Sequence, residues 1–537
     1  MRLANHTATK ITVITITAIS LVFTLISDGR SDDFYFMTAV SGDSIGDRFY
    51  NIAKGRGDVN GDGFEDVLIG APCDGWSSYV KLFFGGVEFD TIPDLIFLNE
   101  PLYFPTCFAV SAFAGDVNND GFDDILIGDP EYCPAMHNSG RAYFYYGGED
   151  PDTIPEMVFT GEYFGYSLGS NVSAAGDVNG DGYDDWLILA PATFWETGVI
   201  YLYFGSAEPD SICDIFFEGY FRHMLLFDSP ALGDINGDGF DDLIFYRWDE
   251  TTGYYSPEIH LGSENMDTIP DLQWIGTSLF VYTSPISGAG DINHDGFNDW
   301  LMHSNSNVEL YFGSPHPDTT VDIVIEPESP CDYVGSQVVN GDIDGDGIGD
   351  LILSGITYNG LNTGQVLGYC GGAAFDNNYD YFFDSGVLHL SLGTSLGLSD
   401  VNGDSIAEVL AGAAQYQSPS YWGPGQVWFL TTQPVPGVLP HQPKIPTSFS
   451  LSAFPNPFNP TTTIRFQLPV AGFVKLAVFD VSGRRVGAGL PRPYTGDWHP
   501  PGTHEVTFNA ANLPSGIYFA RLTAGDFQQT KKMVLVK

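Results

Sequence analysis

Asp177-Val-Asn179-Gly-Asp181-Gly-Tyr-Asp-Asp185, followed at once by the apolar run Trp186-Leu-Ile-Leu189, is the stretch from which the fold of this chain can be deduced. It combines regularly spaced side-chain oxygens, a glycine and a strand-like run. Similar stretches begin at seven positions, which are Asp58, Asp116, Asp177, Asp234, Asp291, Asp342 and Asp400. Their starts are separated by 58, 61, 57, 57, 51 and 58 residues, and a period in this range indicates a propeller or a solenoid.

Each repeat contains four short apolar runs. In the third repeat these are residues 163–168, 186–190, 199–204 and 212–217, separated by the acidic loop and by turns rich in glycine, proline and acidic residues. Amphipathic helical spacing is missing throughout. Four short antiparallel strands per repeat form the blade of a β-propeller, so the sequence predicts an all-β, seven-bladed propeller over residues 31–432. The aromatic third runs are interpreted as packing between adjacent blades.

The two ends of the repeat region complement each other. Residues 33–37 resemble the fourth run of a repeat, although they precede the first one. The seventh repeat ends after its third run, at residues 426–430. Because an open ring would leave exposed strand edges, we expect a strand near residues 33–39 to complete the seventh blade.

Composition changes abruptly after the repeats. Residues 433–446 contain five prolines and are predicted to be an extended linker. Residues 447–537 carry nine Lys and Arg against four Asp and Glu, a net charge of +5, so the remainder of this −48 chain carries −53. Alternating runs at 462–468, 473–479, 504–508, 517–522 and 532–536 predict a small Ig-like β-sandwich as a separate domain.

Residues 1–30 have the pattern of a secretory signal peptide. Arg2 and Lys10 supply positive charge, and residues 11–26 form the apolar region. An uncleaved membrane anchor is the alternative, and no transmembrane span is expected in the mature chain. In an exported chain the six cysteines can form disulfides. Cys73, Cys107 and Cys133 fall in neighbouring repeats and are the first candidates to pair, with isolated buried thiols as the alternative.

The strongly acidic balance limits the classes of partner. Nucleic acids and anionic membranes need a basic surface, so neither is expected to bind. Disorder is excluded because 43% of the residues are hydrophobic and 14% are aromatic. We therefore interpret the negative charge as placed for cations.

The acidic loops have the donor spacing of a calcium site. Calcium takes six to eight oxygens, and in a tight loop positions 1, 3, 5 and 9 can converge with the main-chain carbonyl of position 7, while glycine at position 6 allows the turn. The predicted ligands are Asp58, Asn60, Asp62, Phe64 and Asp66; Asp116, Asn118, Asp120, Phe122 and Asp124; Asp177, Asn179, Asp181, Tyr183 and Asp185; Asp234, Asn236, Asp238, Phe240 and Asp242; Asp291, Asn293, Asp295, Phe297 and Asp299; Asp342, Asp344, Asp346, Ile348 and Asp350; and Asp400, Asn402, Asp404, Ile406 and Glu408.

Up to seven calcium ions are expected, with unequal affinities. The seventh loop has Ser405 in place of the glycine and should be the weakest site. The sixth has four carboxylates and should be the tightest. An EF-hand is excluded because position 12 is apolar and strand-like runs follow the loops. The tripeptide Arg56-Gly57-Asp58 looks adhesive, but Asp58 is the first residue of a loop, so its carboxylate is expected to point inward.

The repeats resemble the FG-GAP repeats of integrin α-subunit propellers and their bacterial relatives. The resemblance rests on Phe164-Gly165 before a loop and Gly70-Ala71-Pro72 after one, with looser matches at Val334-Gly335 and Ala190-Pro191. It implies a seven-bladed propeller with calcium in the loops that join the first and second strands, and with binding loops on the opposite face. Integrins carry calcium in only some blades, so seven filled sites would exceed that pattern.

The C-terminal residues resemble the sorting domain of bacterial type IX secretion and are also similar to the Ig-like domain of flagellar hook-capping proteins. The matching motifs are residues 454–461, 478–484, 513–518 and 531–537. The resemblance implies recognition by the secretion machinery, export across an outer membrane, and a chain that is secreted or attached to the outer surface of a bacterium.

Three functions remain open from the sequence. The leading hypothesis is a calcium-binding adhesion module that binds an unknown protein or glycan through loops around Cys73, Cys133, Trp195, Trp248 and Tyr416. The second is a polysaccharide-active enzyme, although no catalytic motif is found. The third is a passive structural protein of the envelope.

Overall fold

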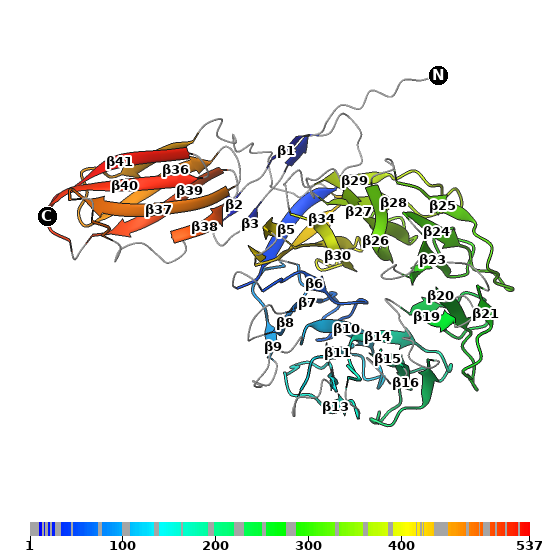
Figure 1. Cartoon of the computed structure of the whole chain (residues 1–537). Coiled ribbons are helices and arrows are strands. Elements are labelled where there is room, and N and C mark those ends of the chain that lie inside the picture. Colours follow the sequence, from blue (N-terminus) through cyan, green and yellow to red (C-terminus); the bar gives the residue numbers. More distant parts are fainter. Residues whose placement is uncertain are drawn as a thin grey trace, which may run out of the picture. The chain divides into compact units, whose positions relative to one another are not determined.

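The structure is a computed structural model of the chain, shown in Figure 1. It describes residues 34–43, 47–72, 78–87, 89–98, 108–133, 139–162, 165–191, 198–219, 230–249, 254–274, 286–304, 306–327, 332–357, 364–384, 390–414, 416–418, 421–422, 424–433, 449–468, 472–482, 484–486, 495–499, 502–510, 513–524 and 527–537, together with four short strands nearer the start, β1 (Lys10–Thr12), β2 (Thr15–Ile16), β3 (Ser20–Leu21) and β4 (Thr24–Ile26).

The chain divides into two compact units, with the main boundary between Val438 and Leu439. The first unit contains seven four-stranded antiparallel sheets arranged as a ring (Figure 1). Six of them use consecutive strands: β6 (Asn51–Ile52), β7 (Val67–Ala71), β8 (Tyr79–Phe83) and β9 (Leu95–Leu98); β10 (Val110–Gly115), β11 (Asp124–Asp129), β12 (Arg141–Tyr145) and β13 (Met157–Thr160); β14 (Asn171–Gly176), β15 (Asp185–Ala190), β16 (Val199–Tyr203) and β17 (Ile215–Glu218); β18 (Ala231–Gly233), β19 (Asp242–Asp249), β20 (Tyr254–His260) and β21 (Leu272–Gln273); β22 (Ile286–Gly290), β23 (Asp299–Ser304), β24 (Asn307–Tyr311) and β25 (Ile323–Ile325); and β26 (Asp332–Gly341), β27 (Asp350–Thr357), β28 (Gln365–Tyr369) and β29 (Tyr381–Asp384). The predicted seven-bladed propeller is confirmed.

The seventh blade is assembled from both ends of the repeat region. Its strand order is β30 (Leu392–Ser399), β31 (Glu408–Ala413), β34 (Gln426–Thr431) and then β5 (Tyr35–Ser41). β5 pairs antiparallel with β34, with Val40 opposite Val427 and Phe36 opposite Leu430. The expectation that a strand near residues 33–39 closes the ring is therefore confirmed, and β5 covers the edge that β34 would otherwise expose.

The first strand of the third blade differs from the prediction. It is β14 at residues 171–176, and not residues 163–168. β14 pairs with β15, with Val172 opposite Ile188. The other residues of β14 are small or polar, so they do not form the apolar run by which a strand is predicted from sequence. Leu168 instead forms an isolated bridge with Gly140 of the preceding blade, and Phe164 lies outside the described residues.

Aromatic side chains fill the seams between blades. Phe144 of the second blade lies 5.2 Å, centroid to centroid, from Trp186 of the third, and Trp186 stacks on Tyr203 at 5.4 Å. Phe217 and Phe245 join the third and fourth blades in the same way at 5.0 Å. These side chains are fully or almost fully buried, so the aromatic runs are packing elements, as predicted.

The cysteine expectation is partly wrong. Cys133 is a free thiol, as are Cys213 and Cys370, while Cys73 and Cys107 lie outside the described residues. The structure therefore gives no disulfide to Cys133. Within the described part of the chain, no helix is long and apolar enough to cross a membrane.

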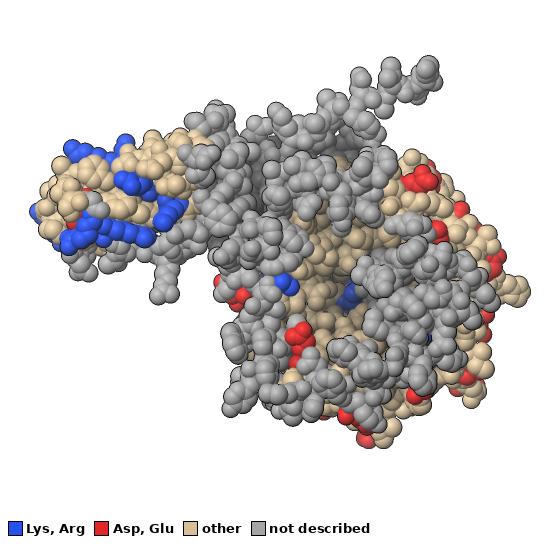
Figure 2. Space-filling view, in the orientation of Figure 1, with Lys and Arg blue, Asp and Glu red and all other residues tan. Residues whose placement is uncertain are grey.

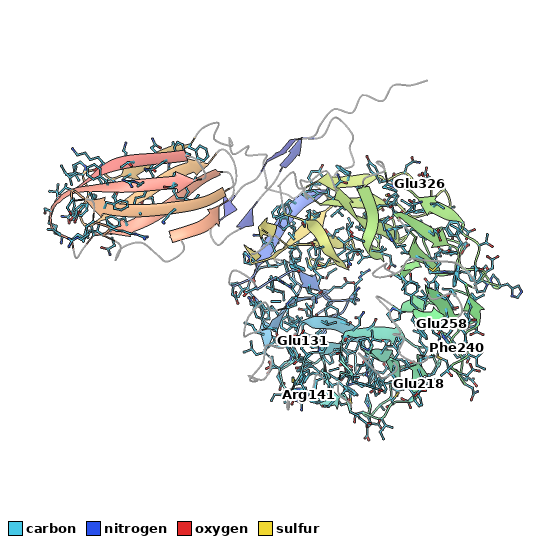
Figure 3. The ribbon with its side chains drawn as sticks, in the orientation of Figure 1. Glu131, Arg141, Glu218, Phe240, Glu258 and Glu326 are labelled. Atoms are coloured by element: carbon cyan, nitrogen blue, oxygen red, sulfur yellow. The ribbon has the colours of Figure 1, made fainter. Side chains whose placement is uncertain are left out.

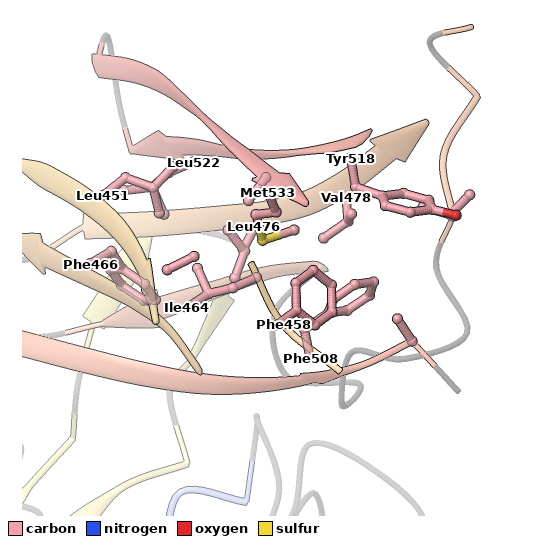
Figure 4. Packing of buried hydrophobic residues seen from close by; sticks show 14 of the residues in the cluster. Leu451, Phe458, Ile464, Phe466, Leu476, Val478, Phe508, Tyr518, Leu522 and Met533 are labelled. Carbon is pink, nitrogen blue, oxygen red and sulfur yellow. The ribbon is translucent and has the colours of Figure 1, made fainter. Parts of the chain in front are cut away.

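The second unit is a β-sandwich. One sheet has the order β35 (Ser450–Phe454), β36 (Thr461–Leu468), β39 (Gly502–Asn509), and the other has the order β38 (Thr495–His499), β37 (Gly472–Asp480), β40 (Gly516–Ala524), β41 (Phe527–Leu535). Figure 4 shows residues of both sheets, such as Ile464 and Phe508 of the first and Leu476 and Leu522 of the second, in one buried core. This arrangement agrees with the predicted Ig-like sandwich.

The Pro- and Asn-rich motif before β36 is tied to the last strand of the sandwich. The side chain of Asn456 accepts a hydrogen bond from the N–H of Val534 at 2.8 Å and donates one to the carbonyl of Lys532 at 2.9 Å. The N–H of Phe458 donates to the carbonyl of Val534 at 2.9 Å. The motif therefore covers the edge of β41.

Ring closure can be tested by a matched pair of substitutions in β5. Phe36 is 5% exposed and meets the edge of Trp428 at 5.5 Å, whereas the adjacent Tyr35 is 41% exposed. We expect Phe36→Ala to lower the free energy of unfolding by about 3–5 kcal/mol and Tyr35→Ala to change it by less than about 0.5 kcal/mol. Chemical denaturation of both variants measures the difference, and equal effects would contradict the role of β5 in closure.

Candidate metal centres

All seven acidic loops occupy the same place in their blades. Each joins the first strand to the second, as between β14 and β15. In an up-and-down sheet this hairpin lies at the same end as the one joining the third and fourth strands. The residues of the predicted ligand sets are therefore placed together loop by loop, at one end of every blade.

The third loop shows how the carboxylates shape the backbone. Asp177 accepts hydrogen bonds from the N–H groups of Asp181 and Gly182, at 3.0 and 2.9 Å. Asn179 Oδ1 accepts from the N–H of Asp181 at 2.8 Å, and Asp181 Oδ1 accepts from the N–H of Tyr183 at 3.1 Å. The side chains at positions 1, 3 and 5 thus all point toward the main chain of the same loop, which is the inward orientation expected from their spacing.

The turn requires a left-handed backbone at two positions. Position 6 has φ between 84° and 97° in the six loops with glycine there, and Ser405 adopts φ 70° in the seventh. Position 4 is also left-handed in every loop, including at Asn119 (φ 56°) and His294 (φ 58°). Glycine avoids a steric cost in this region and asparagine tolerates it, so Ser405 and His294 mark the strained loops. The requirement at position 4 was not predicted.

The carboxylate at position 9 is buried beneath each loop. In the third loop Asp185 is fully buried and accepts hydrogen bonds from the N–H groups of Val178, at 3.0 Å, and Gly205, at 2.8 Å. Burial, together with neighbouring carboxylates, raises the pKa of this group to about 8. The same causes raise the pKa to about 7 or 8 at Asp66, Asp124, Asp242, Asp299, Asp350 and Glu408. Seven carboxylates are thus held where a negative charge is unfavourable unless a cation neutralises it.

The sixth loop has the densest set of donors. Ligand atoms of Asp342, Asp344 and Asp346 lie within 4.8 Å of one another, and so do those of Asp344, Asp350 and Cys370. The Cys370 thiol donates to Asp344 Oδ2 at 3.3 Å. These groups could hold a metal ion. Cys370 was missed by the sequence analysis because it lies after the third strand, far from the loop in sequence.

The seventh loop differs at position 9. Glu408 accepts a hydrogen bond from the side chain of Asn402 at 2.7 Å, whereas in the third loop the corresponding amide of Asn179 donates to Asp181. Within the described part of the chain, Oε2 of Glu408 is buried and has no hydrogen-bond partner. The longer side chain changes the donor arrangement of this loop, and an orphaned carboxylate oxygen is a ready position for a cation.

The charged side chains of the Arg-Gly-Asp tripeptide form contacts within the fold, and the carboxylate of Asp58 points inward, as expected. Asp58 accepts hydrogen bonds from the N–H groups of Asp62 and Gly63, at 3.1 and 2.7 Å. Arg56 forms an ion pair with Glu65, with Nε 2.8 Å from Oε1. Both charged side chains of the tripeptide therefore have partners within the first loop.

Neighbouring loops also contact one another. The side chain at position 7 covers the left-handed residue at position 4 of the preceding loop: a Cβ added to Gly180 would lie 2.4 Å from the ring of Phe240, which is labelled in Figure 3. Phe122 covers Gly61 and Phe64 covers Gly403 in the same way. From the sequence, position 7 was expected to contribute only its main-chain carbonyl to the metal site. The aromatic residue that recurs at position 7 is the sequence signal for this second contact.

Comparison with known proteins assigns the C-terminal unit first. Residues 452–537 match the family model described as "Secretion system C-terminal sorting domain". The C-terminal unit is a type IX sorting domain. It directs the chain through type IX secretion to the cell surface or outside the cell, a route that implies contact with the secretion machinery.

The propeller is similar to integrin α-subunits. Integrin alpha-5 of Xenopus laevis is 26% identical over 224 residues, which is 39% of this chain and 21% of the relative. Integrin alpha-4 of Xenopus laevis is 28% identical over 248 residues, 44% of this chain and 23% of the relative. Integrin alpha-PS2 of Drosophila melanogaster is 34% identical over 119 residues, 20% and 8% respectively. The chain thus spans less than a quarter of the length of these curated relatives.

A solved structure titled "Novel fungal alcohol oxidase with catalytic diversity among the AA5 family, in complex with copper" aligns with 91% of this chain and 98% of its own, at 9% identity and a TM-score of 0.36. A score this low supports no conclusion about fold or activity.

The buried carboxylates predict how pH acts on the metal-free chain. Their pKa values are raised from about 4 to about 7 or 8, so between these values the folded state binds more protons than the unfolded state. Stability must then fall as pH rises through this window. We expect the melting temperature in chelator to drop by roughly 5 °C or more between pH 5 and pH 8. Scanning calorimetry measures it, and Asp185→Asn, which cannot titrate, should reduce the drop.

Proposed function

We propose that the seven acidic loops bind calcium and that the metal stabilises the first hairpin of each blade. The donors fit this ion: each loop offers carboxylate oxygens, an amide or a fourth carboxylate, and a main-chain carbonyl, which are the hard oxygen ligands that calcium takes. The ligands would be positions 1, 3, 5 and 9, with the carbonyl of position 7. The observation that supports the proposal most directly is the recurrent buried carboxylate at position 9, whose charge needs a cation.

Bound calcium would reduce the electrostatic repulsion among the negative charges of the folded propeller. The part of the chain before residue 447 carries −53, from −48 for the whole chain and +5 for the remainder. Figure 2 shows Lys and Arg gathered on the C-terminal unit, while Asp and Glu dominate the charged surface visible on the propeller. Each bound calcium adds two positive charges at a loop, so the ions reduce self-repulsion as well as ordering the hairpins.

We further propose that the mature chain acts at the cell surface as a binding or adhesion module for a protein or a glycan. The support for this proposal is that the two ends of the blades differ in how much their loops vary in sequence. One end carries seven loops of nearly constant sequence, whereas the connections between second and third strands, such as those after Ala71 and Ala190, differ in sequence and length from blade to blade. A rigid scaffold that displays variable loops is the usual architecture of a recognition surface. Most residues of these connections lie outside the described ranges.

The calcium proposal is tested by a matched pair of aspartates in the third blade. Asp181 is at position 5 of the loop, and Asp210 lies outside the loops, in the turn where its Oδ1 accepts from the N–H of Ile212 at 2.6 Å. We expect saturating calcium to raise the melting temperature of the unmodified chain, since metal held at 100 times its Kd adds about 2.7 kcal/mol per site. By isothermal titration calorimetry, Asp181→Ala should lower the calcium stoichiometry by one and Asp210→Ala should leave it unchanged.

An unchanged melting temperature in calcium and chelator would overturn the assignment. If both Asp181→Ala and Asp210→Ala lower the calcium stoichiometry by one, the loss cannot be assigned to removal of a ligand at position 5.

The adhesion proposal is tested on cells. We expect cells that display the chain to adhere to an immobilised panel of glycans and surface proteins in calcium, and to lose adhesion in chelator. Replacing residues 192–197 and 73–77, which connect β15 to β16 and β7 to β8 in the sequence, with Gly and Ser should abolish binding, and the melting temperature of the variant checks that the propeller is folded. Adhesion equal to that of cells lacking the chain would refute the proposal.

A further inference from the structure

In four of the seven acidic loops, the carboxylate at position 8 links the loop to the one before it in the ring. Asp123 Oδ2 accepts a hydrogen bond from the N–H of Asp58, which is position 1 of the first loop, at 2.7 Å. The same bond recurs at three other joints: Asp184 accepts from Asp116 at 2.9 Å, Asp241 from Asp177 at 2.9 Å, and Glu65 from Asp400 at 2.7 Å. We call this bond the carboxylate clasp.

The clasp is built into the backbone around it. The N–H of Asp123 donates to the carbonyl of Asp58 at 3.1 Å, so the two residues exchange a pair of bonds. The residue before position 1 is glycine at three of the four clasps, and at Gly115 and Gly176 the absence of a side chain leaves room for the carboxylate. A Cβ added to Gly115 would lie 2.3 Å from Asp184 Oδ2, and one added to Gly176 would lie 2.1 Å from Asp241 Oδ2. A side chain at Gly115 or Gly176 would therefore meet the carboxylate, whereas the fourth clasp, between Glu65 and Asp400, forms with Ser399 at this position.

The clasp joins two metal loops at their ligand positions. Asp58 is the first ligand of its loop, and Asp123 is adjacent in sequence to Asp124, the last ligand of the next. An ion that fixes the second loop therefore also fixes the group that holds the main chain of Asp58. Ordering one loop removes part of the entropic cost of ordering its neighbour, which is the condition for positive coupling between sites.

The series of clasps is interrupted in one part of the ring. Position 8 is Asn298 in the fifth loop, Gly349 in the sixth and Ala407 in the seventh. Gly349 and Ala407 have no carboxylate to offer. Within the described residues, no side chain accepts a hydrogen bond from the N–H of Asp234, Asp291 or Asp342. Six joints have a main-chain hydrogen bond from the N–H of position 8 to the carbonyl of position 1, and among the described residues this bond is missing at the joint between the fifth and sixth loops.

We propose that the loops of blades 7, 1, 2, 3 and 4 form one coupled series of calcium sites joined by carboxylate clasps, while the loops of blades 5 and 6 fill independently of each other. This inference rests on the proposed calcium binding. It assigns to Glu65, Asp123, Asp184 and Asp241 a positioning role that acts on the ligands of the neighbouring blade.

The test follows hydrogen exchange of individual loops in the full chain with calcium, by mass spectrometry. Asp120→Ala disables the second loop. We expect it to speed exchange of residues 58–64 in the first loop by roughly fivefold or more, the lower end of ordinary coupling. In an Asp123→Ala background this added effect should disappear. Asp123→Asn keeps an oxygen acceptor without the charge, so it should retain the coupling and distinguish the hydrogen bond from electrostatic repulsion.

The interrupted joint supplies a matched control and a gain of function. Asp346→Ala disables the sixth loop and should leave exchange of residues 291–297 in the fifth loop unchanged. A Cβ at Gly349 would meet nothing within 4 Å, so Gly349→Asp can be accommodated. We expect Gly349→Asp to install a clasp and to make the fifth loop sensitive to Asp346→Ala.

The outcomes separate the two proposals. If calcium protects each loop but Asp120→Ala leaves the first loop unchanged, or acts on it equally with and without Asp123→Ala, the coupled series is refuted and calcium binding stands. If Asp346→Ala alone speeds hydrogen exchange in the fifth loop as strongly as Asp120→Ala does in the first, the coupling between loops does not depend on the clasp. If calcium protects no loop, both proposals fail.

Discussion

The propeller depends on carboxylate oxygens that accept hydrogen bonds from main-chain N–H groups of tight loops. Asp177 and Asp185 do this within the third loop, and Asp241 does it for the same loop from the next blade. A loop that turns through left-handed residues exposes N–H groups that no strand can satisfy, and a nearby aspartate is the shortest acceptor available. The accompanying cost is a cluster of like charges, which the proposed calcium ions would offset.

This constraint explains why the blades and the loops cannot be considered separately. The position-9 carboxylate joins its loop to the end of the third strand, as Asp185 does with Gly205. Positions 7 and 8 then join the loop to the preceding blade. The acidic loop, the hairpin and the seam between blades therefore share the same few residues, so the proposed calcium at one loop would act on the stability of the ring. The connections at the other end of the blades can vary in sequence because this end holds the fold.

Sequence reasoning succeeded where one residue type had one plausible role. The closing strand was predicted from an orphaned fourth run, and the left-handed position 6 from its glycine; both agree with the structure. It failed where the signal was weak or remote. β14 is rich in small residues and was assigned too early in the chain, and Cys370 reaches the sixth loop from the end of the third strand. Cys133 was a candidate for a disulfide because it lies in a repeat next to those of Cys73 and Cys107, and it is a free thiol, which was the alternative.

The sequence by itself determined the repeat, the number of blades, the order of acidic and amide residues within each loop and the sorting domain at the C-terminus. These are local properties, since a period, a spacing or a motif is complete within a short stretch of chain. Only the tertiary structure decided what the unassigned positions do. Asp123 contacts Asp58 because the packing of adjacent blades brings together residues 65 positions apart. The acidic residue recurs at position 8 in the sequence, but its partner in the neighbouring loop is a long-range contact that the spacing within one loop does not give.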